Sequence, residues 1–312
     1  MSKERCTYDL YFLKNVPGAL RYKLAHKMKN CTRFRGQKGI SLDYSNEVLR
    51  SFIRAGKPFA AIHFGGTELG AINNYEKVRL GYRKNFKDSV KYSMKNNAGF
   101  YPADDIHLRH YGETWLKECA NADILGIMGL HMEDYFQKKY LPKAKIIQYE
   151  GMEPLRGNWT ELLKGKKVLV ISPFTAEIEA QYQKREKLFL DQPSILPEFE
   201  LKVLTSPLTL GDEKPVLPTF FDGLDQMKEA IRGIDFDIAL VGCGAYTAFL
   251  CCFIKSIGKM AIETGGATPT LFGIMGKRWE KREHVAKHVN SDWIRPYNKA
   301  AGFDKIEGGA YW

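Results

Sequence analysis

Two glycines and a carboxylate separate an apolar run from a helical pattern in Phe59-Ala-Ala-Ile-His63-Phe64-Gly65-Gly66-Thr67-Glu68-Leu69-Gly70-Ala71-Ile72. Five of the six residues before Gly65 are apolar, which predicts a buried strand, and the spacing from Thr67 to Tyr75 predicts a helix. Glycine permits a sharp turn and a close ligand approach, and a helix N-terminus presents free N–H groups to phosphate. Glu68 would then bind a cation or sugar hydroxyls. An ordinary helix start, stabilised by Thr67 or Glu68, is the alternative.

Strand and helix patterns alternate along most of the remaining chain. Strands are predicted at 124–128, 144–149, 167–171, 200–204, 236–241 and 259–263, and helices at 68–79, 108–120, 132–140, 159–163, 176–189, 220–232, 245–257 and 270–274. The segment that follows the helix 68–79, up to Asn97, is predicted as a polar connection. The alternation predicts an α/β fold, Rossmann-like, with a mostly parallel sheet and helices on both faces.

The chain of 312 residues carries no repeat or obvious linker. We expect a basic segment at 1–50 and one domain at 51–312, with residues 157–165 as the best candidate for a seam. Hydrophobic residues make up 44% and charged residues 27%, as in soluble globular proteins. The longest uncharged run, Ile238–Ile254, is short for a membrane span, and we see no signal peptide. The six cysteines lack metal spacing and are expected to be buried free thiols of a cytoplasmic protein.

The net charge of +11 is concentrated near the N-terminus. No acidic residue lies between Asp9 and Asp43, whereas eight cations do: Lys14, Arg21, Lys23, Lys27, Lys29, Arg33, Arg35 and Lys38. Such a stretch attracts anions, and we expect an anionic membrane surface at the inner face of the membrane rather than nucleic acid, for which no recognisable module is present. A solvated basic face is the alternative.

Glycine-rich or polar residues follow five predicted strands: Gly65–Glu68, Gly151–Glu153, Ser172–Phe174, Gly242–Tyr246 and Glu263–Gly266. Ligands of open α/β sheets bind at the carboxyl ends of strands. The shared position of these residues therefore predicts one binding site at that edge of the sheet.

A second interpretation concerns the segment from Gly242 to Glu263. A strand, a glycine turn and an acid about 20 residues later bind ribose in Rossmann proteins and also resemble the first motif of adenosylmethionine-dependent methyltransferases. Thr247 replaces the third glycine, and few residues follow Glu263, which counts against both families. A purely structural tight turn is a further alternative.

Histidine pairs have spacings that suit metal binding on a helix. His107 with His110 and His284 with His288 lack a nearby cysteine or an H-E-x-x-H arrangement. We therefore expect surface histidines.

Several blocks resemble the GT-D-type glycosyltransferases of bacterial surface-polysaccharide biosynthesis. The stretch Ile62–Leu69 is similar to their R-x-G-x-x-E or R-F-G-D-G-E element. Further similar blocks are Asn97–Pro102, Ser172–Phe174 with Gln181-Tyr182, Gly265-Gly266 with Leu271–Trp279, and Glu307–Trp312. The resemblance runs from about Ser51 to the C-terminus. It implies a Rossmann-like fold and transfer of a sugar from a nucleotide donor to a glycan or lipid-linked acceptor, as in capsule synthesis.

The resemblance also implies roles for single residues. Glu68 would serve the donor sugar or a metal, Lys277 and Arg278 would contact the diphosphate, and Glu153 would be the base, with Asp104 as its reserve. The other donor-binding candidates are His63, Gly65, Gly66, Thr67, Ser172, Gly242, Gly244, Tyr246, Gly265 and Gly266. A methyltransferase and a non-catalytic sugar-nucleotide-binding protein remain the alternatives.

The sequence departs from the family element at two positions. His63 stands where arginine is usual, and Gly66 stands where metal-dependent members carry aspartate. Without that carboxylate one hard oxygen ligand is missing, so we expect Mn²⁺ or Mg²⁺ to be weakly bound, by Glu68 and the diphosphate, or replaced by Lys277 and Arg278.

Overall fold

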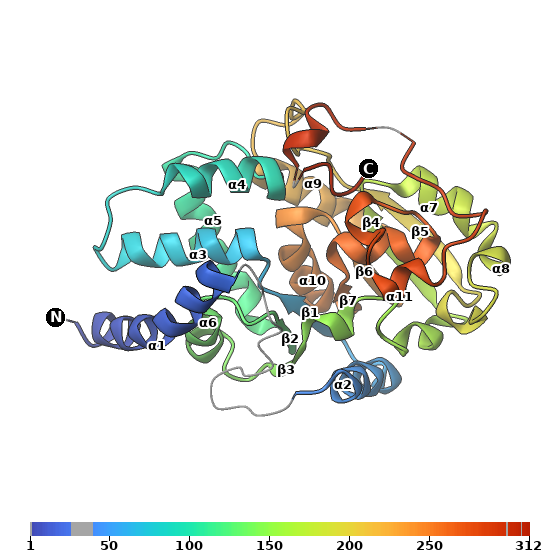
Figure 1. The fold of residues 1–312 in the computed structure, drawn as a ribbon, viewed down its shortest axis with the longest axis horizontal. Helices are drawn as coiled ribbons and strands as arrows, with labels where there is room; N and C mark the ends of the chain where they lie inside the picture. The colour runs from blue at the N-terminus through green and yellow to red at the C-terminus, as the bar shows by residue number, and fades with distance from the viewer. Residues whose placement is uncertain (1, 26–39, 298, 307) are drawn as a thin grey trace.

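The computed structural model describes residues 2–25, 40–297, 299–306 and 308–312. They contain a sheet of seven parallel strands in the order β3-β2-β1-β7-β6-β4-β5 (Figure 1). The strands are β1 (Phe59–His63), β2 (Ile124–Ile127), β3 (Lys145–Gln148), β4 (Lys167–Ser172), β5 (Glu200–Thr205), β6 (Ile238–Val241) and β7 (Met260–Glu263). The predicted α/β class and parallel sheet are confirmed.

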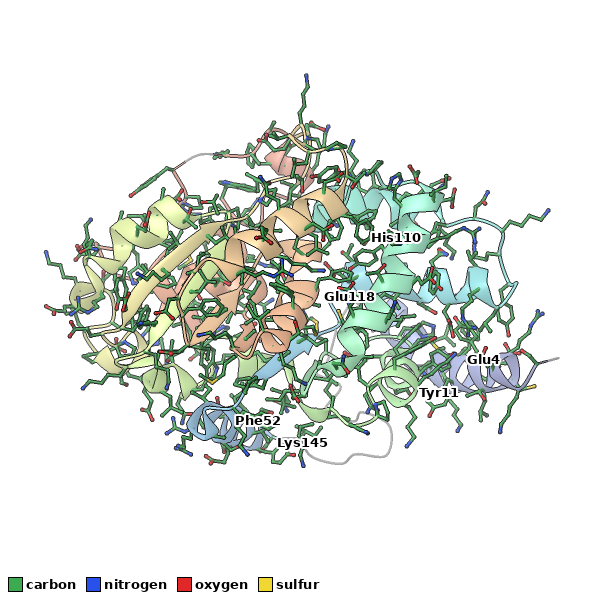
Figure 2. All side chains as sticks on the ribbon, turned by 180° about the vertical axis from the view of Figure 1, so that it is seen from behind. Glu4, Tyr11, Phe52, His110, Glu118 and Lys145 are labelled. Carbon is green, nitrogen blue, oxygen red and sulfur yellow. The ribbon has the colours of Figure 1, made fainter. Side chains whose placement is uncertain are left out.

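Helices cover both faces of this sheet, which Figure 1 and Figure 2 show from opposite sides. The α-helices are α1 (Lys3–Ala25), α2 (Leu42–Ala55), α3 (Gly66–Arg79), α4 (Asp88–Ala98), α5 (Asp105–Glu118), α6 (Glu133–Tyr140), α7 (Thr175–Tyr182), α8 (Arg185–Leu188), α9 (Phe220–Arg232), α10 (Thr247–Ser256) and α11 (Glu283–Ala286). Short 3₁₀ turns include η2 (Tyr149–Met152), η3 (Trp159–Leu163) and η6 (Gly265–Phe272). Among the described residues, none of these helices is long and apolar enough to cross a bilayer.

Alternate residues of the strands point into two hydrophobic cores, one on each face of the sheet. Ala60 and Ile62 of β1 face the core under α3, α4, α5, α6, α9 and α10, whereas Phe59 and Ala61 face the core under α2, α7 and η6. All four residues of β2, β6 and β7 are buried. Strands buried on both faces read as continuous apolar runs, which is why these strands were predictable.

The predictions differ from the structure in three helical regions. Residues 88–98, predicted as a polar connection, form α4, which Gly99 ends with a positive φ of 70°. Only Met94, Asn96 and Ala98 of this helix are buried, so its apolar periodicity is weak. The predicted helix 176–189 is divided into α7 and α8, and 270–274 belongs to the 3₁₀ turn η6, which contains Pro269.

Neither the boundary expected at residue 50 nor the seam expected at 157–165 interrupts the elements around it. Helix α2 spans residue 50, and one sheet continues across residues 157–165 because β4, after this segment, pairs with β6 and through it with the strands before it. Most of the basic stretch (Lys27, Lys29, Arg33, Arg35 and Lys38) lies outside the described residues.

The connections reverse direction between β4 and β6. From β4 the chain moves outward to β5, whereas from β6 it moves the other way to β7, which lies beside β1. β1 and β7 are paired in register from Phe59 with Met260 to Ala61 with Ile262. Such a reversal leaves a crevice at the carboxyl ends of the strands, where ligands of this fold class bind.

Candidate functional site

A pocket lies at this reversal point. Its wall is built from Pro173 and Phe174 after β4, Ser206–Leu210 after β5, Gly242–Gly244 and Tyr246 after β6, Gly265, Gly266 and Pro269 after β7, Asn97–Gly99, and Tyr311 with Trp312. Three of the five predicted strand-end segments thus contribute to its wall, because parallel strands end at one edge. The cavity measures about 60 Å³, which is room for water or a small group.

The glycines after β6 are required by packing. A Cβ on Gly242 would lie 2.2 Å from Thr268 Oγ1 and 2.3 Å from the Gly265 carbonyl oxygen. Gly244 has a φ of +60°, and its Cβ would lie 2.6 Å from the Ala98 carbonyl oxygen. Both glycines therefore let protein backbone, rather than a cofactor, approach closely, which favours the structural tight turn over a cofactor-binding turn.

His63 and Glu263 join the carboxyl ends of β1 and β7. The Glu263 carboxylate accepts a hydrogen bond of 2.8 Å from the His63 backbone N–H, and its other oxygen lies 3.1 Å from Nδ1 of the His63 ring. Both side chains are nearly buried. Burial alone would lower the pKa of His63, but Glu263, supported by Glu68 and Glu133, outweighs burial and raises the pKa. The imidazole is therefore held toward its charged form.

Glu68 folds back over the turn that precedes its helix. A Cβ on Gly65 would lie 2.0 Å from Glu68 Oε2, so only glycine leaves room for this carboxylate. Its charge raises the pKa of His63 and contributes to the raised pKa of the buried Tyr111 hydroxyl. Glu68 is thus turned toward the carboxyl end of β1, while Thr67 is half-buried and Gly66 exposed beside it.

Two residues of this cluster were not predicted. Glu133, buried at the start of α6, accepts hydrogen bonds of 2.7–3.1 Å from the backbone N–H groups of residues 128–130. Burial raises its pKa to about 7, although these bonds and His63 favour the charged form. Tyr149 packs its ring 4.4 Å from that of His63. No motif marks either residue, since Glu133 reads as an ordinary acid in a first helical turn.

Gly265 connects this cluster with the pocket. It has a φ of +52°, and its Cβ position lies 3.7 Å from the Tyr149 hydroxyl and 3.8 Å from His63 Cε1. Because Gly265 also lines the pocket, His63 and Tyr149 lie directly behind the pocket wall.

Arg278 lies against the neighbouring glycine. A Cβ on Gly266 would lie 2.9 Å from an Arg278 guanidinium nitrogen, and the same nitrogen donates to the Tyr311 hydroxyl at 3.0 Å. The exposed Lys277 ammonium donates to the Gly308 carbonyl at 3.3 Å. A guanidinium beside a glycine is an arrangement that suits a phosphate group, since Arg presents planar donors and glycine clears the approach.

The two predicted bases lie in different places. Glu153 is buried, with its carboxylate 3.2 Å from Arg156 Nε and 3.5 Å from His284 Nε2. Burial raises the pKa of Tyr149, and the negative charges of Glu153 and Glu263 raise it further. Asp104 is half-exposed and accepts from the His107 backbone N–H as the N-cap of α5. Among the described residues, Asp104 is not part of the pocket wall.

The side chains of Ser172 and Tyr246 both contact neighbouring parts of the protein. The Ser172 hydroxyl accepts from the Phe174 N–H at 3.2 Å, where it shapes the turn after β4. Tyr246 stacks on Phe220 at 4.1 Å between ring centroids and lines the pocket from below.

The expectations for histidines and cysteines need two corrections. His288 is buried rather than on the surface, because its ring pairs with Asp191 at 3.0 Å and packs against Phe189. Of the cysteines in the described part of the chain, Cys6 is exposed and the other four are buried, all as free thiols. Cys31 lies outside the described residues.

The residues of the site do not form a protein-only metal centre. Within the described ranges, no group of three or more histidine, cysteine, aspartate or glutamate side chains is arranged to hold an ion. Gly66 offers no oxygen beside Glu68, so we derive no catalytic step through a metal.

Comparison with known proteins finds distant structural likeness. No protein-family model and no curated protein matches the chain. One solved structure is described by the words "The highly conserved domain of unknown function 1792 has a distinct glycosyltransferase fold"; it is 11% identical, with a TM-score of 0.36, over 82% of this chain and 99% of that one. A selenomethionine-substituted structure of the same domain is 10% identical, with a TM-score of 0.35 and the same coverage.

Proposed function

We propose that this protein is a glycosyltransferase that moves a sugar from a nucleotide-diphosphate sugar to a glycan or lipid-linked acceptor of surface polysaccharide synthesis. One observation supports this proposal: Gly265 and Gly266 line the pocket, the Arg278 guanidinium lies beside Gly266, and His63, paired with Glu263, lies beside Gly265. A nucleotide-diphosphate sugar requires a cation beside its diphosphate and acid–base groups beside its sugar, and both kinds of group lie near these glycines.

The diphosphate half of the donor would bind on the glycine side. Arg278 and Lys277 would neutralise the charge that develops on the leaving diphosphate, which is a large contribution where water is excluded. Gly265 and Gly266 would let the phosphate approach the backbone. A cavity of about 60 Å³ is far smaller than such a donor. We therefore expect Tyr311 and Trp312, which line it, to shift on binding.

The sugar half would lie toward His63 and Glu68. In a single displacement, the acceptor hydroxyl forms a bond to the anomeric carbon while the bond from that carbon to the diphosphate oxygen breaks. The hydroxyl proton passes to the Glu153 carboxylate, and the electron pair leaves with the nucleoside diphosphate. Arg156 and His284, 3.2 and 3.5 Å away, would hold the Glu153 carboxylate in position for this role, and Glu68 would bind sugar hydroxyls.

A ligand panel tests the donor class. Thermal unfolding is measured with nucleotide-diphosphate sugars, free nucleotides and adenosylmethionine; a ligand at about 100-fold excess over its Kd stabilises by about 2.7 kcal/mol. We expect a nucleotide sugar to stabilise the parent and Arg278→Gln to lose that shift. Lys281→Gln, a nearby exposed cation, is the matched control. Stabilisation by adenosylmethionine alone would overturn the proposal, and donor binding without turnover on any glycan or lipid-linked acceptor would indicate a binding protein.

A further inference from the structure

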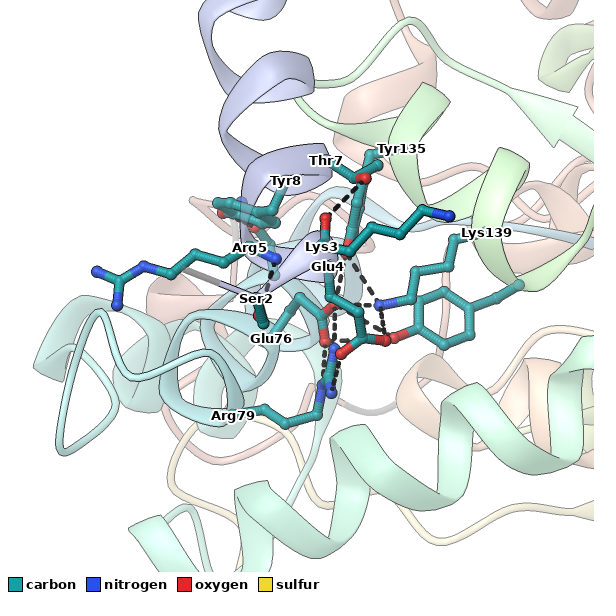
Figure 3. Close-up of polar contacts among 12 residues, drawn as sticks. Ser2, Lys3, Glu4, Arg5, Thr7, Tyr8, Glu76, Arg79, Tyr135 and Lys139 are labelled. Carbon is teal, nitrogen blue, oxygen red and sulfur yellow. Dashed lines mark hydrogen bonds and ion pairs between the residues drawn. The ribbon is translucent and has the colours of Figure 1, made fainter.

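One side of α1 is fixed to the rest of the protein. Tyr8 donates from its hydroxyl to Asn73 Oδ1 at 2.7 Å, and Asn15 donates from its side-chain amide to Asp134 Oδ1 at 2.9 Å. Glu4 forms an ion pair of 2.9 Å with Arg79 (Figure 3). These residues recur along the helix with helical spacing, so they share one face.

A buried carboxylate anchors this contact. Glu76 of α3 is fully buried and accepts hydrogen bonds from Arg79 at 2.8 Å, the Tyr135 hydroxyl at 2.6 Å and Lys139 at 2.9 Å (Figure 3). Burial alone would raise the pKa of Glu76, but these bonds outweigh it and lower the pKa to about 2. The network holds Arg79 and Lys139 where both reach Glu4, so the orientation of α1 is set.

The opposite side of α1 carries an exposed apolar stripe. Leu10 is 50% exposed, Leu13 67% and Leu20 53%; Cys6, which precedes them, and Pro17, between the last two, are exposed as well. We call these five residues the α1 stripe. Their spacing of four, three, four and three residues places them on one line along a helix. Three half-exposed leucines in line form a surface that normally contacts an apolar partner.

Lysines lie on the flank of the stripe. Lys3 and Lys14 stand seven residues before and four residues after Leu10, so both border it. A hollow of about 340 Å³ opens on the same flank between α1 and α6, and its wall includes Lys3 and Lys138, together with the ion pair of Glu4 and Lys139. An apolar line with ammonium groups beside it suits a layer that has acyl chains below and anionic groups at its surface.

We propose that the α1 stripe lies in the headgroup region of an anionic membrane, with α1 parallel to the surface and its leucines reaching the acyl chains. The competing occupant is a second copy of the helix, since the same spacing serves helix pairs. Two copies would bring together two stretches that each have eight cations and no acid between Asp9 and Asp43. Anionic lipid supplies the opposite charge, whereas a second copy repeats the same one.

The first experiment measures flotation of the full chain with vesicles. Phosphatidylcholine vesicles are compared with vesicles that also contain phosphatidylglycerol, at low and moderate salt. The double variant Leu10→Asn/Leu13→Asn should bind the anionic vesicles at least about tenfold more weakly. The matched control is Leu190→Asn/Val216→Asn, whose side chains are 71% and 98% exposed. Leu190 follows α8, which lies at the far end of the molecule from α1 (Figure 1).

The second experiment reports the position of the stripe directly. Cys6 belongs to the stripe and, in a Cys31→Ser background, is the exposed thiol among otherwise buried described ones, so an environment-sensitive dye can be attached there. Its emission should shift to the blue with anionic vesicles and change little with neutral ones. Equal binding of the double variant and its control, or a dimer in light scattering that the double variant abolishes, would overturn the proposal. Neither readout depends on glycosyl transfer.

Discussion

His63 and Glu263 are 200 positions apart in the chain, yet the Glu263 carboxylate binds both the backbone N–H and the ring of His63, at 2.8 and 3.1 Å. This carboxylate is what holds the imidazole pKa above its usual value despite burial. In Glu263→Gln, burial therefore prevails and the pKa of His63 should fall. The measurement is an NMR titration of the His63 Cε1 proton, and an unchanged midpoint would show that Glu68 and Glu133 suffice.

The same pair makes stability depend on pH in a defined direction. A histidine whose pKa is raised by folding stabilises fully below its unfolded pKa of about 6.5, and this contribution is lost as pH rises through the folded value. Glu263→Gln should therefore cost more stability at about pH 5.5 than at about pH 9. Denaturant midpoints of parent and variant at both values test the sign. A loss that is equal at both would assign the whole effect to the backbone hydrogen bond.

Glu68→Gln should retain the fold and lose most transfer activity. Its carboxylate lies over Gly65 and faces His63, so an amide of the same shape keeps the packing and removes the charge. We expect turnover to fall by about 100-fold. Glu186→Gln, the same change at an exposed acid of α8, is the control and should change turnover little. Near-normal turnover of purified, folded Glu68→Gln would remove Glu68 from the site.

Metal dependence should be weak. Gly66 has no side-chain oxygen, so an ion beside Glu68 would need the donor phosphates for most of its ligands. After EDTA treatment, a substantial share of activity should remain, and added Mn²⁺ or Mg²⁺ should raise it moderately. Micromolar affinity for either ion without nucleotide, measured by calorimetry, would show that protein side chains other than Glu68 bind the ion.

Gly242→Ala should destabilise the protein by about 1–3 kcal/mol. The new Cβ meets Thr268 Oγ1 and the Gly265 carbonyl oxygen, both part of a packed turn. Gly70→Ala in α3 is the matched control: apart from its chain neighbours and the backbone of its own helix, no described atom lies within 4 Å of its Cβ position, and alanine favours the helix by about 0.5–1 kcal/mol. Urea unfolding compares the two. A neutral Gly242→Ala would reopen this turn as a cofactor site.

The sheet was predictable from sequence because its strands are buried on both faces and therefore uniformly apolar. The partners within the site were not. Glu263 could be recognised as an acid at a strand end. Its contact with His63, however, depends on β7 lying beside β1, and the order of strands in a sheet cannot be predicted from a local sequence pattern. Asp104 shows the reverse case: an aspartate before a helix has the same pattern whether it caps the helix or serves a substrate. The structure shows the cap.

The pairing of β1 with β7 also bears on how the protein is made. β7 ends at Glu263, 200 residues after the end of β1 at His63, so a chain still on the ribosome exposes one edge of β1 until these residues have been synthesised. Closing so long a loop is slow, and an uncovered parallel edge attracts other chains. We expect chaperones that shield strand edges to matter most at this stage. Binding competence should arise late and all at once, when the last strand is inserted.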